Sequence, residues 1–381
     1  MLISVLLFFL IYFLLSLAIK PTSISLLIAS FFLCLTPVGE TNIEIIIILV
    51  SLIFCLYKKI FLINKKRFLI LLLIISLNVA PILISFDYDL YKTLGKSLKI
   101  FVFLLPFTFS SIRYIKVDID LLIKSILFLT FLFSFLWLFE RVYDGGYLFD
   151  IRLSGIVLDP NYSVTIICAL FILLYLYRLD ISTNKTYIFL FILFLFLSQS
   201  VSSIVLFIAL FFLLKKTILF RKNGFLFFLL TLLVVLNILC IIYFSHKIHL
   251  TMLSDWGDSY ISLKINSLLV RLYSQIEGIR LMIDKPHHFI YGFGSRTTFE
   301  LFGKVMHNAY LQTLFDHGLS LLISIYLFIN IIGKKYFFYP AIFYLQIMNF
   351  LFDNYFMGLV TLFYILGLLF TKYSLELKEN K

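Results

Sequence analysis

The sequence predicts an all-α, polytopic integral membrane protein, and three of its features lead to this fold class. Of the 381 residues, 62% are hydrophobic and the mean hydropathy is +1.07, well above the values of soluble domains. Apolar runs of about 15 to 20 residues recur along the chain, close to the length at which a helix crosses a bilayer core. Basic residues form short clusters between these runs, as topology signals do. The net charge of +12 therefore does not indicate a nucleic-acid partner.

The apolar runs define the candidate membrane spans. They cover approximately 1–19, 23–38, 42–57, 68–86, 98–112, 121–140, 160–177, 186–198, 202–214, 224–244, 318–332, 336–352 and 354–371. The first is interpreted as a retained helix, because it lacks the basic start and small-residue cleavage site of a secretory signal. The stretch 186–214 is expected to form two short helices that turn at the serine-rich segment 198–203.

The basic clusters predict the topology. They lie at 58–67, 215–222, 334–335 and 372–381. If the first cluster faces the cytoplasm, simple alternation of the spans places every later cluster there as well. The segments 87–97, 141–159, 245–317 and 353–354 are then outside. Three candidate spans precede the first cluster, so the sequence leaves open twelve or thirteen crossings and the side of the N-terminus.

The predicted organisation has three parts. Residues 1–244 contain the first ten or so spans, 245–317 form one large periplasmic loop, and 318–381 contain the last spans and a short basic cytoplasmic tail. All six histidines fall in the large loop. Within it, 261–284 has the apolar stripe of an amphipathic helix. Arg271 and Arg280 are nine residues apart on this helix and point to opposite sides, so we do not expect them to hold the same group.

The large loop also contains the first set of candidate site residues. Arginine offers a planar fork of donors that suits phosphate oxygens, and histidine accepts a proton near neutral pH. Glycines allow a close backbone approach to a ligand. The residues, in chain order, are Arg271, Gly292, Gly294, His307, Asn308 and Tyr310. Each has a simpler interpretation, as a headgroup anchor, an ordinary turn or a helix cap. Asp316, His317 and Gly318 are interpreted as helix entry, and the adjacent histidines at 287 and 288 do not predict a metal site.

Two other outside loops contain polar groups of interest. Arg152 and Gly155 precede Pro160 and Asn161, at the start of a span. Helix-entry chemistry accounts for the residues 159–161 but not for Arg152 and Gly155. The acidic pair at positions 87 and 89 fits metal or base chemistry, but acids of this kind commonly serve only to solvate a polar loop.

In this order, the segments resemble the O-antigen ligase and polymerase superfamily of bacterial surface-polysaccharide assembly. The family pattern matches Arg152 to Gly155, Pro160 with Asn161, and the serine-rich turn. It continues through Arg271, Pro286, the two glycines of 291–294, and the His-Asn-x-Tyr-Leu segment at 307–311. The resemblance covers roughly residues 150 to 332. The chain departs from the pattern at the turn, where members often have Ser-Arg and this sequence has Ser202 and Ser203.

The resemblance implies a metal-independent and cofactor-free glycosyltransferase of the bacterial inner membrane, which acts on the periplasmic side with inversion. Its donor is an oligosaccharide on undecaprenyl pyrophosphate. Arg152 and Arg271 would hold the pyrophosphate, and His307 would orient the acceptor hydroxyl or take its proton. The other residues expected to contact the pyrophosphate or the glycan are Arg280, Asn161, Gly292, Gly294, Asn308 and Tyr310.

The resemblance leaves the acceptor open. A polymerase transfers to a repeat unit on the same lipid carrier, and a ligase transfers to the lipid A core. High Phe, Ile and Leu content with few Ala and Gly indicates an AT-rich gene, as in surface-polysaccharide clusters, and favours the polymerase. A lipid-linked oligosaccharide flippase is a further alternative, although the spans show neither internal repeats nor many charges. Membrane lipid is an expected partner, and a polysaccharide chain-length regulator follows only from the family.

Overall fold

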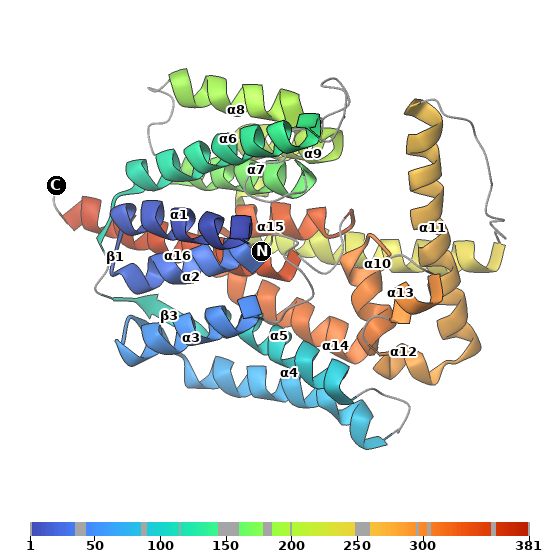
Figure 1. Cartoon of the computed structure of the whole chain (residues 1–381). Helices are drawn as coiled ribbons and strands as arrows, with labels where there is room; N and C mark the ends of the chain where they lie inside the picture. The colour runs from blue at the N-terminus through green and yellow to red at the C-terminus, as the bar shows by residue number, and fades with distance from the viewer. Residues whose placement is uncertain are drawn as a thin grey trace.

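The structure is a computed structural model. It describes residues 2–34, 43–84, 90–113, 116–143, 160–177, 185–198, 200–247, 260–294, 297–302, 306–351 and 356–379. These residues are mostly helical, as predicted (Figure 1). The helices of the first half are α1 Leu2–Ala18, α2 Thr22–Cys34, α3 Ile43–Tyr57, α4 Lys65–Ile84, α5 Leu90–Leu104, α6 Ile119–Tyr143, α7 Pro160–Leu176 and α8 Lys185–Ser198. The others are α9 Val201–Lys216, α10 Asn223–Lys247, α11 Tyr260–Asp284, α12 His287–Tyr291, α13 Thr297–Phe302, α14 Ala309–Gly333, α15 Tyr339–Met348 and α16 Phe356–Glu379.

Among the described residues, four helices are long and apolar enough to cross a membrane, by length and composition. They are α6, α10, α14 and α16, and several shorter apolar helices accompany them. The most apolar of the four windows lies in α10, where only 22% of the residues are buried within the protein. Its outward side chains include Leu232, Leu236 and Leu239, all exposed. A helix that is apolar on its exposed face suits a hydrocarbon environment rather than water.

Each predicted span overlaps one helix of the structure, and the two helices around the serine-rich turn are confirmed as α8 and α9. The predicted bounds of the span 98–112 were wrong, because α5 begins eight residues earlier, at Leu90. Pro106 follows in the short 3-10 helix η1 Leu105–Thr108, and β3 Phe109–Ile112 then pairs with β2 Phe61–Ile63. A second antiparallel pair joins β1 Ile19–Lys20 to β4 Lys116–Val117. The sequence did not predict either strand pair.

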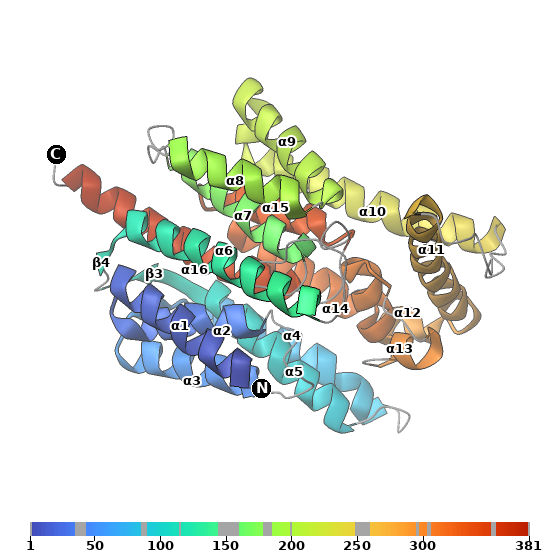
Figure 2. The ribbon, with the colours of Figure 1, turned by 45° about the horizontal axis from the view of Figure 1, so that its top comes forward.

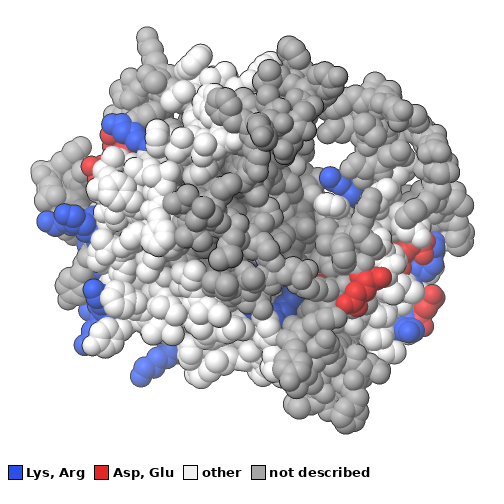
Figure 3. All heavy atoms as spheres, viewed as in Figure 1, with Lys and Arg blue, Asp and Glu red and all other residues white. Residues whose placement is uncertain are grey.

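The basic helix ends meet at one end of the bundle. The Arg67 guanidinium, at the start of α4, donates to the carbonyls of Phe107 at 3.3 Å and Phe109 at 3.0 Å, and to the Tyr336 hydroxyl at 3.3 Å. The Asn223 amide, at the start of α10, donates to the carbonyls of Lys334 at 2.9 Å and Tyr336 at 2.8 Å. The starts of α4 and α10 therefore lie beside the end of α14. Figure 3 shows charged side chains mainly toward two edges of the described surface, with uncharged side chains over most of the area between.

The opposite end of the bundle contains α11, α12, α13 and the start of α14 (Figure 1). The predicted amphipathic helix is confirmed as α11, with Ile276 and Ile279 buried as expected from the apolar stripe. Helices α15 and α16 pack in the middle of the molecule, α16 against α2, α5 and α7 (Figure 2). This arrangement places the polar segments of 271–316 at one end of a buried helical core.

Candidate functional site

The site is built around a break in α14. Gly318 has φ 78° and ψ 176°, which interrupts the helix between its first two turns and its longer second part. The carbonyls of Phe315 and Asp316 precede the break. They accept hydrogen bonds from the backbone N–H groups of Phe293 at 2.8 Å and Gly294 at 3.0 Å. The Gly-Phe-Gly segment at 292–294 thus docks on the carbonyls that the broken helix leaves open.

Two glycines make this docking possible. Gly292 has φ 79° and ψ −175°, so it shares with Gly318 a conformation that is essentially restricted to glycine. A Cβ atom on Gly292 would lie 2.3 Å from the backbone nitrogen of His317, and one on Gly318 would lie 2.1 Å from the carbonyl oxygen of Ile290. The two backbones are therefore in direct contact, and neither glycine tolerates a side chain without movement. The predicted turn at Gly292 and Gly294 is part of a helix junction.

The interpretation of Asp316 and His317 as helix entry is corrected by this geometry. Helix α14 begins at Ala309, nine residues before the predicted start, so both side chains lie inside it. Asp316 is 2% exposed and His317 is 7% exposed. The Asp316 carboxylate accepts from the Lys96 ammonium of α5 at 3.1 Å and from the Gln312 amide at 3.0 Å. In sequence, Gly318 beside polar residues is typical of the point where a loop ends and a helix begins, but in the structure Gly318 lies at a kink inside α14.

A buried chain of hydrogen bonds links this kink to α11. The Gln275 amide donates to the carbonyl of Met306 at 2.7 Å, and the Met306 N–H donates to the Gln312 side-chain carbonyl at 3.0 Å. The Gln312 amide donates to Thr298 at 2.6 Å, in addition to Asp316. The network therefore connects α11, α13, α14 and, through the ion pair, Lys96 of α5. It also fixes the backbone immediately before His307.

Through this network, the side of α11 that contains Arg271 lies against the segment that contains His307. Arg271 precedes Gln275 by four residues, so both lie on the same face of the helix. Since Gln275 contacts the carbonyl that joins Met306 to His307, this face is directed at the predicted base. Arg271 is half-buried, and its guanidinium has no hydrogen-bond or ion-pair partner among the described residues. His307 has a left-handed backbone with φ 49°, a conformation that non-glycine residues seldom adopt.

Arg280 is engaged elsewhere, as its position on the opposite side of α11 predicts. Its guanidinium donates to the carbonyl of Ser245, near the end of α10, at 2.9 Å and 3.3 Å. It also forms an ion pair with Glu277, one turn earlier. These contacts give Arg280 a part in joining α10 to α11, and its expected contact with pyrophosphate stays a prediction.

Asn308 caps α14, which confirms the simpler of its two interpretations. Its side-chain oxygen accepts from the N–H groups of Tyr310 at 3.1 Å and Leu311 at 3.2 Å. Its amide group donates to Asn237 of α10 at 3.0 Å, and the residue is 1% exposed. Both ends of the side chain are thus used inside the protein. A role of Asn308 in binding glycan stays a prediction.

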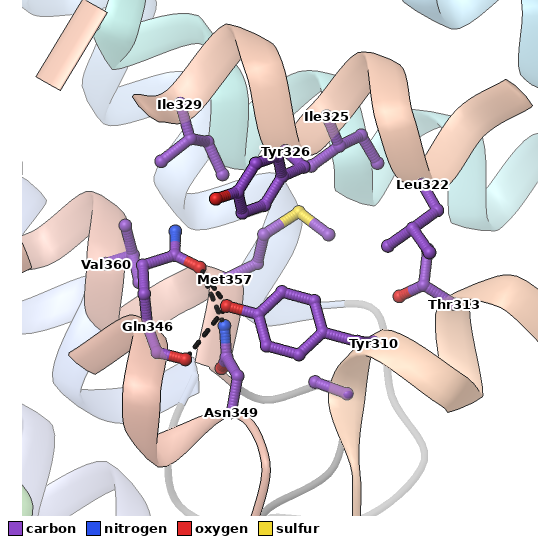
Figure 4. A pocket seen from close by; sticks show the side chains of 11 residues that line it. Tyr310, Thr313, Leu322, Ile325, Tyr326, Ile329, Gln346, Asn349, Met357 and Val360 are labelled. Atoms are coloured by element: carbon purple, nitrogen blue, oxygen red, sulfur yellow. Dashed lines mark hydrogen bonds between the residues drawn. The ribbon is translucent and has the colours of Figure 1, made fainter. Parts of the chain in front are cut away.

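Tyr310 lies in the wall of a small cavity between α14, α15 and α16 (Figure 4). Its hydroxyl lies 2.9 Å from the main-chain carbonyl and 2.8 Å from the side-chain oxygen of Gln346, both acceptors. The cavity has a volume of about 40 Å³ and is also lined by Tyr326 and Asn349. That volume holds water but is far below the size of a site for a sugar. The contacts of Tyr310 in this structure are therefore with the protein interior.

The second group of predicted residues is described in part. The Asn161 side chain, at the start of α7, accepts from the Ser200 hydroxyl at 2.8 Å. The Ser203 hydroxyl lies 2.9 Å from the Ser200 hydroxyl oxygen, and the Tyr344 hydroxyl donates to the carbonyl of Ser203 at 3.1 Å. The helix entry at Asn161 and the serine-rich turn, which the resemblance lists separately, thus meet against α15. Arg152, Gly155 and the acids at 87 and 89 lie outside the described residues.

Sequence reasoning missed Lys96, Gln275 and Gln312. Lys96 had a readable signal, because it lies in a segment that the topology places outside, where basic residues are disfavoured. The two glutamines had none, since each is an ordinary helix residue until its partner is known.

No protein-family model, curated protein or solved structure matches the chain.

Proposed function

We propose that this protein is a membrane glycosyltransferase of the O-antigen polymerase type. It joins oligosaccharide repeat units carried on undecaprenyl pyrophosphate, at the periplasmic face of the bacterial inner membrane. The observation that supports this best is the position of Arg271. Its guanidinium, which has no partner among the described residues, shares a helix face with Gln275, whose amide holds the backbone next to His307. A phosphate-binding donor and a proton acceptor are thereby brought to one end of the bundle.

The proposed topology follows from the helix ends. Contacts of Arg67 and Asn223 group the starts of α4 and α10 with the end of α14, at the end where the lysine clusters lie. We propose that this end faces the cytoplasm and that α1–α10 and α14–α16 form the membrane part of the protein, in which α6, α10, α14 and α16 are long and apolar enough to cross. Helices α11, α12 and α13 then form the periplasmic segment that contains the site.

The proposed reaction is a single inverting displacement. His307 takes the proton of an acceptor hydroxyl, and that oxygen forms a bond to the anomeric carbon of the donor glycan. The bond from this carbon to the pyrophosphate oxygen breaks, and its electron pair leaves with undecaprenyl pyrophosphate. Arg271, together with Arg152, stabilises the charge on the departing group.

The test uses the full chain in lipid nanodiscs with a lipid-linked repeat unit and no nucleotide sugar. Wild-type protein lengthens the repeat unit, as read by mass spectrometry of the lipid products. Arg271→Ala and His307→Ala abolish the lengthening. Arg271→Ala keeps wild-type thermal stability, since no described residue accepts a hydrogen bond from the Arg271 guanidinium. Lys285→Ala is the matched control, because Lys285 is an exposed cation at the end of the same helix. An active Arg271→Ala protein refutes the assigned role.

A gene deletion distinguishes polymerase from ligase. Cells that lack a polymerase retain lipopolysaccharide core with one repeat unit, whereas cells that lack a ligase show bare core. Bare core on a gel contradicts the polymerase assignment. Transfer of the glycan to lipid A core by the purified protein supports the ligase instead.

A further inference from the structure

We infer that Lys96 and His317 form a subsite for a phosphate group near the proposed active site, where Asp316 is the counterion of Lys96 as long as no phosphate is bound. The identity of the ligand, a lipid-linked phosphate, rests on the proposed function. The subsite itself rests on hydrogen-bonding capacity that the described residues leave unused. No part of the family resemblance includes Lys96 or His317.

The Lys96 ammonium has donors to spare. It is a mostly buried group, with a side chain 20% exposed, and one of its three N–H bonds is directed at the Asp316 carboxylate at 3.1 Å. No other described residue accepts from it. The side chain is only partly buried, so a ligand that reaches its exposed part would find ammonium donors that the described residues leave open.

His317 supplies a second group of the same kind. Its side chain is 7% exposed, and its Nε2 atom is buried without a hydrogen-bond partner among the described residues. It lies close enough to Lys96 for the lysine charge to act on it. His317 directly follows Asp316, the partner of Lys96, so α5 and α14 each contribute a polar group with hydrogen-bonding capacity that no described residue uses. A phosphate oxygen is able to accept from the ammonium and, when Nε2 carries its proton, from the imidazole.

The charge pattern of α5 favours an anion over water. Lys96 has Lys92 four residues before it and Lys99 three residues after it, and the described helix contains no acidic residue. The proposed topology puts this end of α5 outside, where the positive-inside rule disfavours lysine. Asp316 is the one acid described beside Lys96, and the Gln312 amide already donates to its other oxygen. Lysine binds phosphate as a compact point charge.

The position of the subsite matches a lipid headgroup at the active site. Asp316 is seven residues beyond Ala309, which is about 10 Å along the helix axis at 1.5 Å per residue. The hydrogen-bond network from Gln275 to Asp316 connects it to the backbone beside His307. A phosphate held by Lys96 is therefore about two helical turns along α14 from the residues proposed to carry out the transfer.

Substitutions of Lys96 and of Asp316 are expected to change phosphate binding in opposite directions. This difference distinguishes a role of the ion pair in binding from a purely structural role. Lys96→Met removes the cation and weakens phosphate binding at least tenfold. Asp316→Asn removes the competing anion, keeps an acceptor for Gln312, and leaves binding equal to wild type or tighter. An ion pair that served only the fold would be damaged from either side, because each change leaves one buried charge unpaired.

The experiment measures binding to the full chain in nanodiscs of zwitterionic lipid. The probes are undecaprenyl phosphate, neutral undecaprenol and soluble inorganic pyrophosphate. Wild-type protein prefers undecaprenyl phosphate over undecaprenol, and His317→Ala reduces this preference. Binding of pyrophosphate with the same dependence on Lys96 also supports the subsite and identifies a free phosphate as its ligand. Lys99→Met is the matched control, since it removes the same charge one turn away.

Two results overturn the inference. One is equal loss of binding in Lys96→Met and Asp316→Asn, and the other is unchanged binding in Lys96→Met. The double variant Lys96→Met/Asp316→Asn has no buried charge, so it controls for folding and is expected to fold without binding phosphate. The outcome is independent of the proposed function. Phosphate binding that depends on Lys96 without glycan lengthening contradicts only the function, whereas lengthening with unchanged binding in Lys96→Met contradicts only the subsite.

Discussion

Replacement of Gly318 by alanine tests the helix break on which the site is built. The alanine Cβ would lie 2.1 Å from the carbonyl oxygen of Ile290, so one of the two backbones must move. The conformation at φ 78° and ψ 176° costs a residue with a side chain about 1–3 kcal/mol. The overlap adds about 1–3 kcal/mol, as overpacking does in other buried sites. Gly318→Ala is therefore expected to lower the stability by about 2–6 kcal/mol.

The effect is measured as the midpoint of thermal unfolding of purified protein, followed by size-exclusion chromatography after heating. Gly318→Ala should unfold several degrees below wild type. Gly224→Ala is the matched control, because a Cβ there meets no atom within 4 Å and the residue lies in the first turn of α10. Gly292→Ala should act like Gly318→Ala, and the double variant should lose less than the sum, since both changes disrupt the same contact. A Gly318→Ala protein as stable as the control would show that the kink is not required.

The remaining predictions concern stability at the two ends of the bundle. Asn308→Ala should cost about 1 kcal/mol or more by removal of the cap, and it also leaves Asn237 without its partner. Asn308→Ser keeps a capping oxygen and should recover part of the lost melting temperature, so equal losses in the two variants would argue against capping. Arg67→Lys keeps the charge, but the lysine side chain is shorter and does not reach the position of Nη1, which donates to the two carbonyls and the Tyr336 hydroxyl, so it should cost about 1–3 kcal/mol. An equally stable Arg67→Lys protein would mean that charge alone is sufficient there.

The sequence predicted the bounds of a helix well where the helix coincides with an apolar run. It predicted them less well where charged residues and tertiary contacts belong to the helix. Helix α5 shows the limit. Its first half contains Lys92 and Lys96, which the sequence analysis assigned to the outside loop 87–97, and the span was assigned to 98–112 instead. The helix continues through the lysines because Lys96 has a buried counterion in Asp316. That partner is 220 positions away, and no local pattern identifies it.

The candidate site was predicted as an order of motifs, without its contacts. The sequence identified Arg271, Gly292 and His307 as members of one group, and α11 with its apolar stripe is confirmed. It did not reveal that Gly292 faces Gly318, since a close backbone contact requires two segments at once. Nor did it distinguish Asn308, which has both ends bonded inside the protein, from a residue directed at a ligand.

The residues of this site are of two kinds: those whose side chains hydrogen-bond to partners inside the protein, and those with donors that no described residue meets. The sequence motifs do not distinguish these two kinds. Asn308, Gln312 and Gln275 have partners inside the protein, and their bonds fix the geometry. Arg271 has none among the described residues, and Lys96 has one acceptor for three donors. Buried donors without acceptors destabilise a protein unless something fills them, so groups of this kind are kept where a ligand supplies the acceptor. The hydrogen-bond network begins at Gln275, one turn from Arg271 on α11, and ends at the ion pair of Lys96 on α5, so one set of bonds fixes the helices that carry both cations.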